Sequence, residues 1–269
     1  MLRFSMIGFG AIGTGVLELV RHDPELQVDR VIVHAGSHDR ARTWLDEHGY
    51  ADTEVSEQLE LGTRQPELVV ECAGHSAIEE HVLPALAHGV PCMIVSVGAL
   101  ATPGLPERLE QAARAGGTQV QLLSGAIGAI DALAGARVGG LDRVSYRGRK
   151  PPRAWQGTAA ERTVNLDAVT VPTLIFEGSA REAAARFPKN ANVAATLGLA
   201  GIGMDRTQVR LYADPQVSEN VHEIEAEGAF GSLSLTMRGR PLPANPKTAA
   251  LTIYCVVRAL GNRAHALII

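Results

Sequence analysis

The sequence predicts an α/β protein in which a doubly wound parallel sheet is followed by a smaller α+β domain with an antiparallel sheet. Three features of the 269-residue chain predict this fold. Apolar runs alternate with helical patterns over residues 2–123, a glycine-rich turn follows the first run, and strands of alternating polarity take over after residue 140. Alternating strands and helices specify a parallel sheet with right-handed crossovers. We expect domains at residues 1–126 and 127–246, with a C-terminal helix, within residues 247–269, packing back on the first.

Gly8, Gly10 and Gly13 lie between a predicted strand at residues 2–7 and a predicted helix. This is the spacing of a Rossmann dinucleotide turn, in which the glycines permit the tight bend, the approach of a pyrophosphate and close helix packing. The phosphates of such a ligand sit at the helix N-terminus, here at Ala11 and Ile12. The turn therefore predicts NAD or NADP as cofactor, although glycine patterns also arise by chance. The buried side of the helix is expected to consist of Val16, Leu17, Leu19 and Val20.

The second strand, at residues 27–34, lacks the acid that binds the adenosine ribose of NAD about 20 residues beyond the glycines. Ser37, Arg40 and Arg42 follow it instead. These side chains can receive the 2′-phosphate of NADP. Alternatively, Ser37 caps the next helix and both arginines are solvated. NAD and NADP therefore both remain open.

Near-continuous apolar strands are predicted at residues 67–74, 91–96 and 119–123, as a parallel sheet covered on both faces requires. A capping box at residues 76–79 is expected to open a helix that runs through Ala87, and a second helix spans residues 106–115. Ligands of such sheets bind beyond the carboxyl ends of the strands. The small-residue loops there, which include Ala73, Gly74 and Ala126, suit close approach to a nicotinamide ring.

The second domain is predicted from strands at residues 141–150, 208–212, 221–227 and 232–237, which alternate as half-exposed strands do. The last two form a hairpin, and we expect all four to make one antiparallel sheet. Helices at residues 179–187 and 193–199 should cover one side of it. An apolar helix is predicted at residues 248–260.

Composition limits the classes of partner. The formal charge of −4 and the pI near 6.1 give no reason to expect nucleic acid or an anionic membrane. The three cysteines lack C-x-x-C spacing, which argues against a disulfide framework and a metal site. No leader or membrane-spanning run is recognised. We expect a cytoplasmic protein, a homodimer, that acts on a small molecule.

His222 is the candidate catalytic residue. The period of two over residues 221–227 places His222 on the face opposite three glutamates, so its side chain should point inward. An inward histidine is more often a hydrogen-bonded core residue than a catalyst, and His75 at a strand end is its rival. Most of the other histidines have helical or terminal polar surroundings: His22, His48, His81, His88 and His265.

Two polar stretches, residues 187–192 and 245–248, offer amide and ammonium donors at predicted helix N-termini, where carboxylates bind well. The alternative is simple capping, with Asn192 and Asn245 starting helices. Arg147, Arg149 and Lys150 form a further cationic cluster, or a solvated strand edge.

The motifs at residues 8–13, 71–74, 96–100, 124–131, 187–196, 220–224 and 245–248 closely resemble those of the L-aspartate dehydrogenase family, and the resemblance covers nearly the whole chain. It implies oxidation of L-aspartate to iminoaspartate with NAD or NADP, which feeds NAD biosynthesis or yields oxaloacetate and ammonia. It places the catalytic histidine at His222 and cofactor contacts at Ala126, Asn190 and Asn192.

Two substrate carboxylates require cations or several N–H donors. The candidates are Lys150, Lys189, Lys247, Asn220 and Thr248. Another amino-acid oxidoreductase of the same fold, similar to homoserine dehydrogenase or dihydrodipicolinate reductase, is the nearer alternative function. A non-catalytic dinucleotide sensor is the more distant one.

Overall fold

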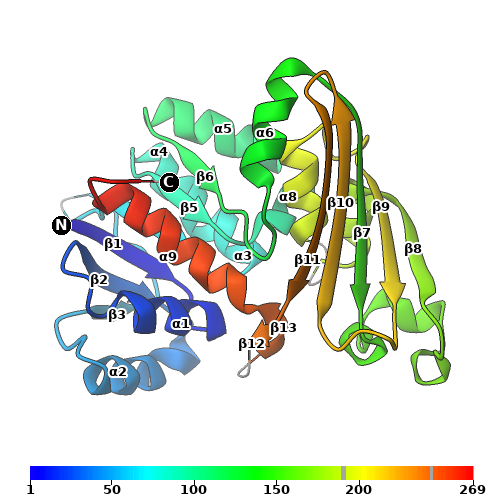
Figure 1. Ribbon diagram of the computed structural model, residues 1–269. Coiled ribbons are helices and arrows are strands. Elements are labelled where there is room, and N and C mark those ends of the chain that lie inside the picture. The colour runs from blue at the N-terminus through cyan, green and yellow to red at the C-terminus, as the bar shows by residue number, and fades with distance from the viewer. Residues whose placement is uncertain (63, 189–191, 243–244, 269) are drawn as a thin grey trace. The chain divides into compact units, whose positions relative to one another are not determined.

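The structure is a computed structural model that describes residues 1–62, 64–188, 192–242 and 245–268. The chain divides into two compact units, Met1–Leu123 with Ile253–Ile269 and Ser124–Thr252. The first unit contains a six-stranded parallel sheet with the order β3-β2-β1-β4-β5-β6 (Figure 1), so the predicted doubly wound sheet is confirmed. Its strands are β1 (Leu2–Ile7), β2 (Leu26–Ile32), β3 (Glu54–Ser56), β4 (Leu68–Glu71), β5 (Cys92–Ile94) and β6 (Val120–Leu122).

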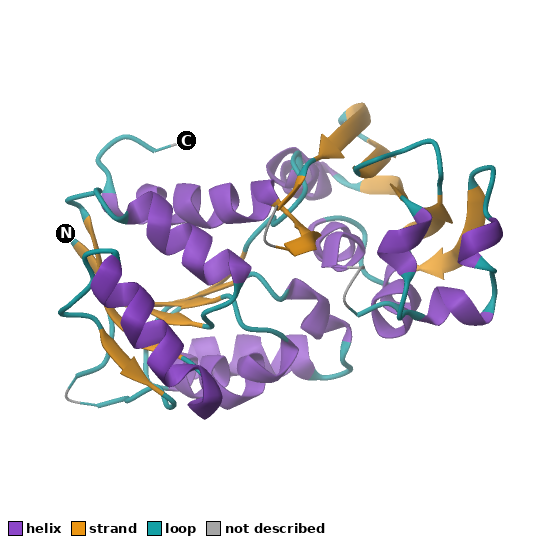
Figure 2. Ribbon diagram, turned by 90° about the horizontal axis from the view of Figure 1, so that it is seen from below, coloured by secondary structure: helices purple, strands orange, loops and turns teal. Residues whose placement is uncertain are grey.

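Helices lie on both faces of this sheet, as Figure 2 shows. They are α1 (Ala11–Val20), α2 (His38–Glu47), α3 (His75–Ala77), α4 (Leu83–Ala87), α5 (Leu105–Ala115) and α9 (Ala250–Ala264). A π-helical segment, Ile78–Val82, joins α3 to α4. The helix thus begins at His75 behind Gly74, and the expected capping box is absent because its serine lies inside the helix.

The core of the first unit is built from the apolar strands and one face of α1. Val16, Leu17 and Val20 are buried as predicted. Leu19 is 51% exposed, which corrects the prediction, because at 3.6 residues per turn it lies to the side of the stripe formed by the other three. The helix α9 contacts α1 where a Cβ on Gly15 would overlap Ile253, and His265 bonds Asp23 at 2.9 Å.

The second unit contains a five-stranded sheet with the order β11-β10-β7-β9-β8 (Figure 1). Its elements are α6 (Ile130–Gly139), β7 (Leu141–Lys150), β8 (Thr173–Ser179), α7 (Ala180–Arg186), α8 (Asn192–Ala200), β9 (Gln208–Ala213), β10 (Asn220–Gly228), β11 (Gly231–Gly239), β12 (Pro241–Leu242) and β13 (Asn245–Ala249). The hairpin of β10 and β11 is confirmed.

Three features of this unit differ from the expectation. The strand β8 was not predicted, and β7 pairs with β9 in parallel, so the sheet is mixed. Asn245 begins the strand β13 and not a helix, because residues 245–249 pair with β12 and α9 starts only at Ala250.

Among the described residues, no helix is both long and apolar enough to cross a membrane.

Candidate active site

The glycine turn of the first unit has the geometry of a phosphate cradle. Gly8 has φ of +100°, and a Cβ on it would lie 2.7 Å from the backbone of Ala73. A Cβ on Gly13 would overlap the carbonyl oxygen of Gly8, so only glycine permits this approach of α1 to β1. Within the described part of the chain, a Cβ on Gly10 would meet nothing within 4 Å, and no side chain caps α1. The space beside Gly10 and the backbone amides of Ala11 and Ile12 in the first turn of α1 therefore fit a pyrophosphate.

A cavity of about 290 Å³ opens at the carboxyl ends of β1, β2 and β4. The cofactor-binding residues expected from the sequence that line it are Gly8, Gly10, Ser37, Arg40 and Ala73. Glu57, which follows β3, and Glu80 line it as well. Acidic side chains therefore reach this cavity from other segments, although the end of β2 lacks one. A carboxylate can accept hydrogen bonds from ribose hydroxyls, whereas Arg40 can bind a phosphate.

Arg40 and Arg42 have different surroundings. Arg40 donates to the carbonyl of Phe9 at 3.3 Å and lies over the Phe9 ring, which keeps its guanidinium at the cavity. Arg42 donates to the carbonyl of Thr53 at 2.6 Å and to the carboxylate of Asp46 at 2.6 Å. These bonds hold Arg42 to its own unit, and it does not line the cavity. Arg42 is therefore half-buried and paired within the first unit, and it is not placed to receive a phosphate in this cavity.

Glu71, at the end of β4, is fully buried and organises the loop that follows. One carboxylate oxygen accepts bonds from the amides of Ala73 and Gly74 and from the Ser96 hydroxyl, each at 2.8 Å. The other accepts from the Ser96 amide at 3.0 Å. The carboxylate thus joins the loops after β4 and β5. Burial and the neighbouring Glu71 raise the pKa of the Cys72 thiol well above its ordinary value, so this thiol stays protonated.

His81 does not have the polar helical surroundings that were expected. It lies in the π-helical segment, is 6% exposed and lines the cavity. Burial lowers its pKa. His75, the rival candidate catalyst, is half-buried at the start of α3 and is not among the residues that line this cavity.

In the second unit, His222 points inward from β10, as the alternation predicts, and is 3% exposed. Its Nδ1 lies 2.8 Å from the Tyr146 hydroxyl on β7. Its Nε2 is buried and has no hydrogen-bond partner in the described part of the chain. Burial, aided by the charge of Lys150, lowers the pKa of His222 to about 3. The imidazole is therefore neutral at pH 7, with one polar atom left for a ligand.

Lys150 lies on the same inward face of β7 and is 7% exposed. Its ammonium is 5.4 Å from the centre of the Trp155 ring. Burial lowers the pKa of Lys150 to about 8, so it remains mostly charged at pH 7. A buried cation near His222 is suited to bind a carboxylate.

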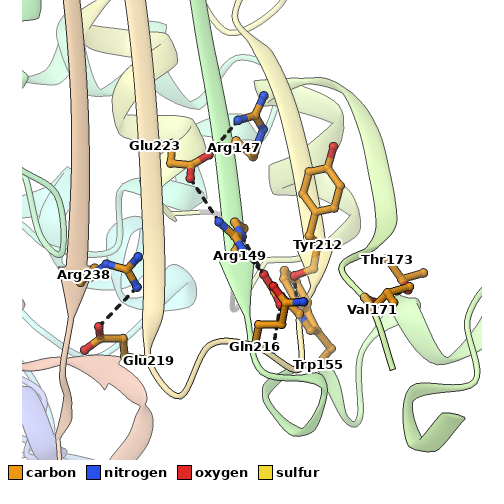
Figure 3. A network of polar contacts seen from close by, with 11 residues as sticks. Arg147, Arg149, Trp155, Val171, Thr173, Tyr212, Gln216, Glu219, Glu223 and Arg238 are labelled. Carbon is orange, nitrogen blue, oxygen red and sulfur yellow. Dashed lines mark hydrogen bonds and ion pairs between the residues drawn. The ribbon is translucent and has the colours of Figure 1, made fainter. Parts of the chain in front are cut away.

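Arg147 and Arg149 do not cluster with Lys150, because successive side chains of a strand point to opposite faces. Figure 3 shows Glu223 between the two arginines, bonded to Arg147 at 2.9 Å and to Arg149 at 3.4 Å. Arg149 also donates to the buried Asp214 at 2.7 Å. The two arginines therefore belong to an ion-pair network on the outer face of the sheet.

Comparison with known proteins agrees with the division of the chain into two units. Residues 131–263 match a family model described as aspartate dehydrogenase, C-terminal, and residues 8–123 match one described as homoserine dehydrogenase, NAD binding domain. The L-aspartate dehydrogenase of Cupriavidus necator is 63% identical over 269 residues, which is 99% of each chain. The chain belongs to the L-aspartate dehydrogenase family.

Other relatives agree. The L-aspartate dehydrogenase of Ralstonia nicotianae is 63% identical over 266 residues, 99% of each chain. A crystal structure of aspartate dehydrogenase from Thermotoga maritima has a TM-score of 0.77 and 25% identity, and the match covers 100% of this chain and 99% of that one. Membership in the L-aspartate dehydrogenase family, with an NAD-binding domain, implies a nicotinamide cofactor.

The remaining residues expected for an L-aspartate dehydrogenase lie as follows. Asn220 is buried at the start of β10, Asn192 begins α8, Thr248 is half-buried in β13, and Ala126 is half-buried in the loop after β6. Lys189 and Asn190 lie outside the described residues, as does the side chain of Lys247. Glu71, His81 and Tyr146 were not predicted from the sequence as parts of the sites. Only Glu71 could have been recognised, because it is an acid inside the apolar run at residues 68–72.

The depressed pKa of His222 predicts a loss of stability in acid. His222 binds a proton near pH 6.5 in the unfolded chain but only near pH 3 in the folded protein. The free energy of unfolding therefore decreases as the pH falls from 6.5 towards 3. Between pH 7 and pH 5 the loss from this residue is about 2 kcal/mol. In His222→Gln the side chain does not titrate, so the decrease in stability between pH 7 and pH 5 should be correspondingly smaller. The thermal midpoints of the wild-type protein and of His222→Gln at pH 7 and pH 5 test this. An equal decrease in midpoint in the two proteins would contradict the prediction.

Proposed function

We propose that the protein oxidises L-aspartate to iminoaspartate with NAD or NADP. The observation that carries the proposal is the buried, unpartnered Nε2 of His222 in the described structure of this L-aspartate dehydrogenase family member. A buried polar atom without a partner costs free energy, so its retention is consistent with a ligand that bonds to it.

The cofactor supplies the acceptor for the hydride that leaves the substrate Cα. The protein has to manage protons, because the amine lone pair forms the imine only after the ammonium has lost one. His222 is neutral at pH 7, so Nε2 can take that proton or activate the water that later attacks the imine. Either role places His222 in contact with the reacting atoms.

Lys150 is the cation that we assign to a substrate carboxylate. Its charge is one of the causes that lower the pKa of His222, and a bound carboxylate would offset this charge. Substrate binding would then raise the basicity of His222 at the moment when the proton must be accepted. Asn220 and Thr248 offer further donors, and Lys189 and Lys247 remain candidates for the second carboxylate.

The test is a panel of L-aspartate, D-aspartate, L-glutamate and L-homoserine, each assayed with NAD and with NADP on the purified protein. We expect kcat/KM for L-aspartate to exceed that for the others by at least about 100-fold, since unpaired buried polar groups penalise the wrong substrate. Preference for L-homoserine would favour the alternative suggested by the family match of residues 8–123. Absence of any turnover would favour a dinucleotide sensor.

Both cofactors should be accepted, because the cavity contains Arg40 as well as the acids Glu57 and Glu80. Arg40→Ala should lower the ratio of kcat/KM for NADP to that for NAD by about 10- to 100-fold, because a charge-assisted hydrogen bond to the 2′-phosphate of NADP is lost. Arg114→Ala is the control, because Arg114 pairs with Glu110 on α5, away from the cavity. A preference for NAD above roughly a thousandfold, or an unchanged ratio in Arg40→Ala, would refute this assignment.

We further propose that the iminoaspartate feeds NAD biosynthesis or hydrolyses to oxaloacetate and ammonia, in the cytoplasm and from a homodimer. Nicotinamide-nucleotide content of cells lacking the protein tests the first route. Sedimentation of the purified protein tests the dimer, and cell fractionation tests the location.

A further inference from the structure

Tyr146 and His222 form a buried pair between two adjacent strands. Tyr146 is 2% exposed, and its ring is stacked on the imidazole with centroids 5.9 Å apart and an interplanar angle of 19°. In the register of β10 and β7, His222 lies opposite Gly148, two residues from Tyr146. A Cβ on Gly148 would lie 2.6 Å from the Tyr146 hydroxyl oxygen. The glycine therefore leaves the space through which this hydroxyl reaches Nδ1.

The hydroxyl is an unusual partner for a histidine that moves protons. A carboxylate at Nδ1 would fix one tautomer and stabilise the charged imidazolium. A hydroxyl can donate to Nδ1 or accept from Nδ1–H, simply by rotating. Burial raises the pKa of Tyr146, so it keeps its own proton in either arrangement. No other hydrogen-bond partner of this hydroxyl is found in the described part of the chain.

We propose that Tyr146 is the positioning residue of His222, holding Nδ1 in both tautomers so that Nε2 remains the atom that meets the substrate. This inference rests on the proposed function. In the resting protein the hydroxyl donates to Nδ1 and Nε2 carries the hydrogen, because this arrangement leaves the fewest buried groups unpaired. This tautomer cannot take a further proton at Nε2. The base is the other tautomer, which forms when Nε2 gives its hydrogen to water that enters with the substrate and Nδ1 takes one hydrogen from water, while the hydroxyl rotates to accept from Nδ1–H. Nε2 then takes the proton of the substrate ammonium, and Tyr146 keeps its own hydrogen throughout.

The variant that tests this role is Tyr146→Phe, which removes the hydroxyl and keeps the ring. Residues that orient a metal-bound histidine through its second nitrogen typically contribute about 10- to 100-fold to activity. By analogy, kcat for L-aspartate should fall by about that factor in Tyr146→Phe. KM for L-aspartate and cofactor Kd should stay within about threefold, because the Tyr146 hydroxyl is directed at Nδ1 of His222. Tyr212→Phe is the matched control, since Figure 3 shows this tyrosine on the outer face of the same sheet. A kcat of Tyr146→Phe within twofold of wild type would overturn the inference.

A second measurement needs no turnover. The imidazole ¹⁵N spectrum of the wild-type protein at pH 7, assigned by its absence in His222→Gln, should show a protonated Nε2 and a hydrogen-bonded, unprotonated Nδ1. In Tyr146→Phe the balance of tautomers should change. A wild-type spectrum averaged between tautomers, as for a free histidine, would overturn the inference. Failure of the proposed function is distinct, because it would appear as wild-type protein that does not oxidise L-aspartate.

Discussion

Replacing His222 with alanine is expected to lower kcat for L-aspartate oxidation by about 10²–10⁴, the usual effect of losing a general acid or base. The cofactor Kd should change little, because the glycine turn and its cavity belong to the other unit. The measurement is kcat, cofactor Kd and thermal midpoint on one preparation.

A core histidine without a catalytic role would behave differently. Its removal would leave a cavity and an unpaired Tyr146 hydroxyl, so the thermal midpoint would fall while folded protein kept most of its rate. His75→Ala is the comparison variant and should retain near wild-type kcat. A near wild-type kcat in His222→Ala, with a clearly lowered midpoint, would reject the catalytic assignment and direct attention to His75.

Glu71→Gln is the second variant for which we expect a large effect, here on the stability of the first unit and on its affinity for the cofactor. The carboxylate accepts bonds from two loop amides and from both polar groups of Ser96. The glutamine side chain keeps one acceptor oxygen, which can take the place of one carboxylate oxygen, but its nitrogen cannot accept the bonds made by the other, and the bonds that remain lose their charge assistance. Hydrogen bonds to charged groups contribute about 1.5–3 kcal/mol each, so the free energy of unfolding should fall by at least about 3 kcal/mol. The loop with Ala73 lines the cavity, so cofactor Kd should also rise at least about tenfold.

Glu67→Gln provides the control for Glu71→Gln. Glu67 lies just before the same strand, is about half exposed and pairs with Arg3 at the surface, where such pairs contribute little. Calorimetry and cofactor titration on both variants measure the effects. If Glu71→Gln keeps the wild-type midpoint and cofactor Kd, the buried carboxylate does not organise the loops.

Local periodicity is the reason that most elements could be predicted. The apolar runs of β1, β4 and β5 and the alternation of β10 are properties of short segments, and each segment folds as its pattern indicates. Pairing between distant segments is not visible in a short window. The parallel pairing of β7 with β9 depends on such long-range contacts and was therefore wrongly expected to be antiparallel.

The candidate site shows the same limit. The alternation places His222 inward, but its partner depends on the register that sets it opposite Gly148. Lys150 was grouped with Arg147 and Arg149 by proximity in sequence, whereas the pleat separates it from them. Glu71 looked like part of an apolar strand, and only the fold brings four donors to its carboxylate.

Asn245 illustrates the opposite error, in which a local motif was given too much weight. Its amide and the following proline are typical of a helix start, yet residues 245–249 form a strand because they pair with β12. The strand β8 was missed because Gly178 and Ser179 interrupt its pattern and suggest a turn before the next helix.

The most direct test of the central claim uses L-aspartate that carries deuterium at Cα. If the protein oxidises L-aspartate by removing this hydrogen as hydride, the reduced nicotinamide cofactor formed in wild-type protein must contain one deuterium, as mass spectrometry will show. Reduced cofactor without deuterium, or no reduced cofactor at all, would contradict the account.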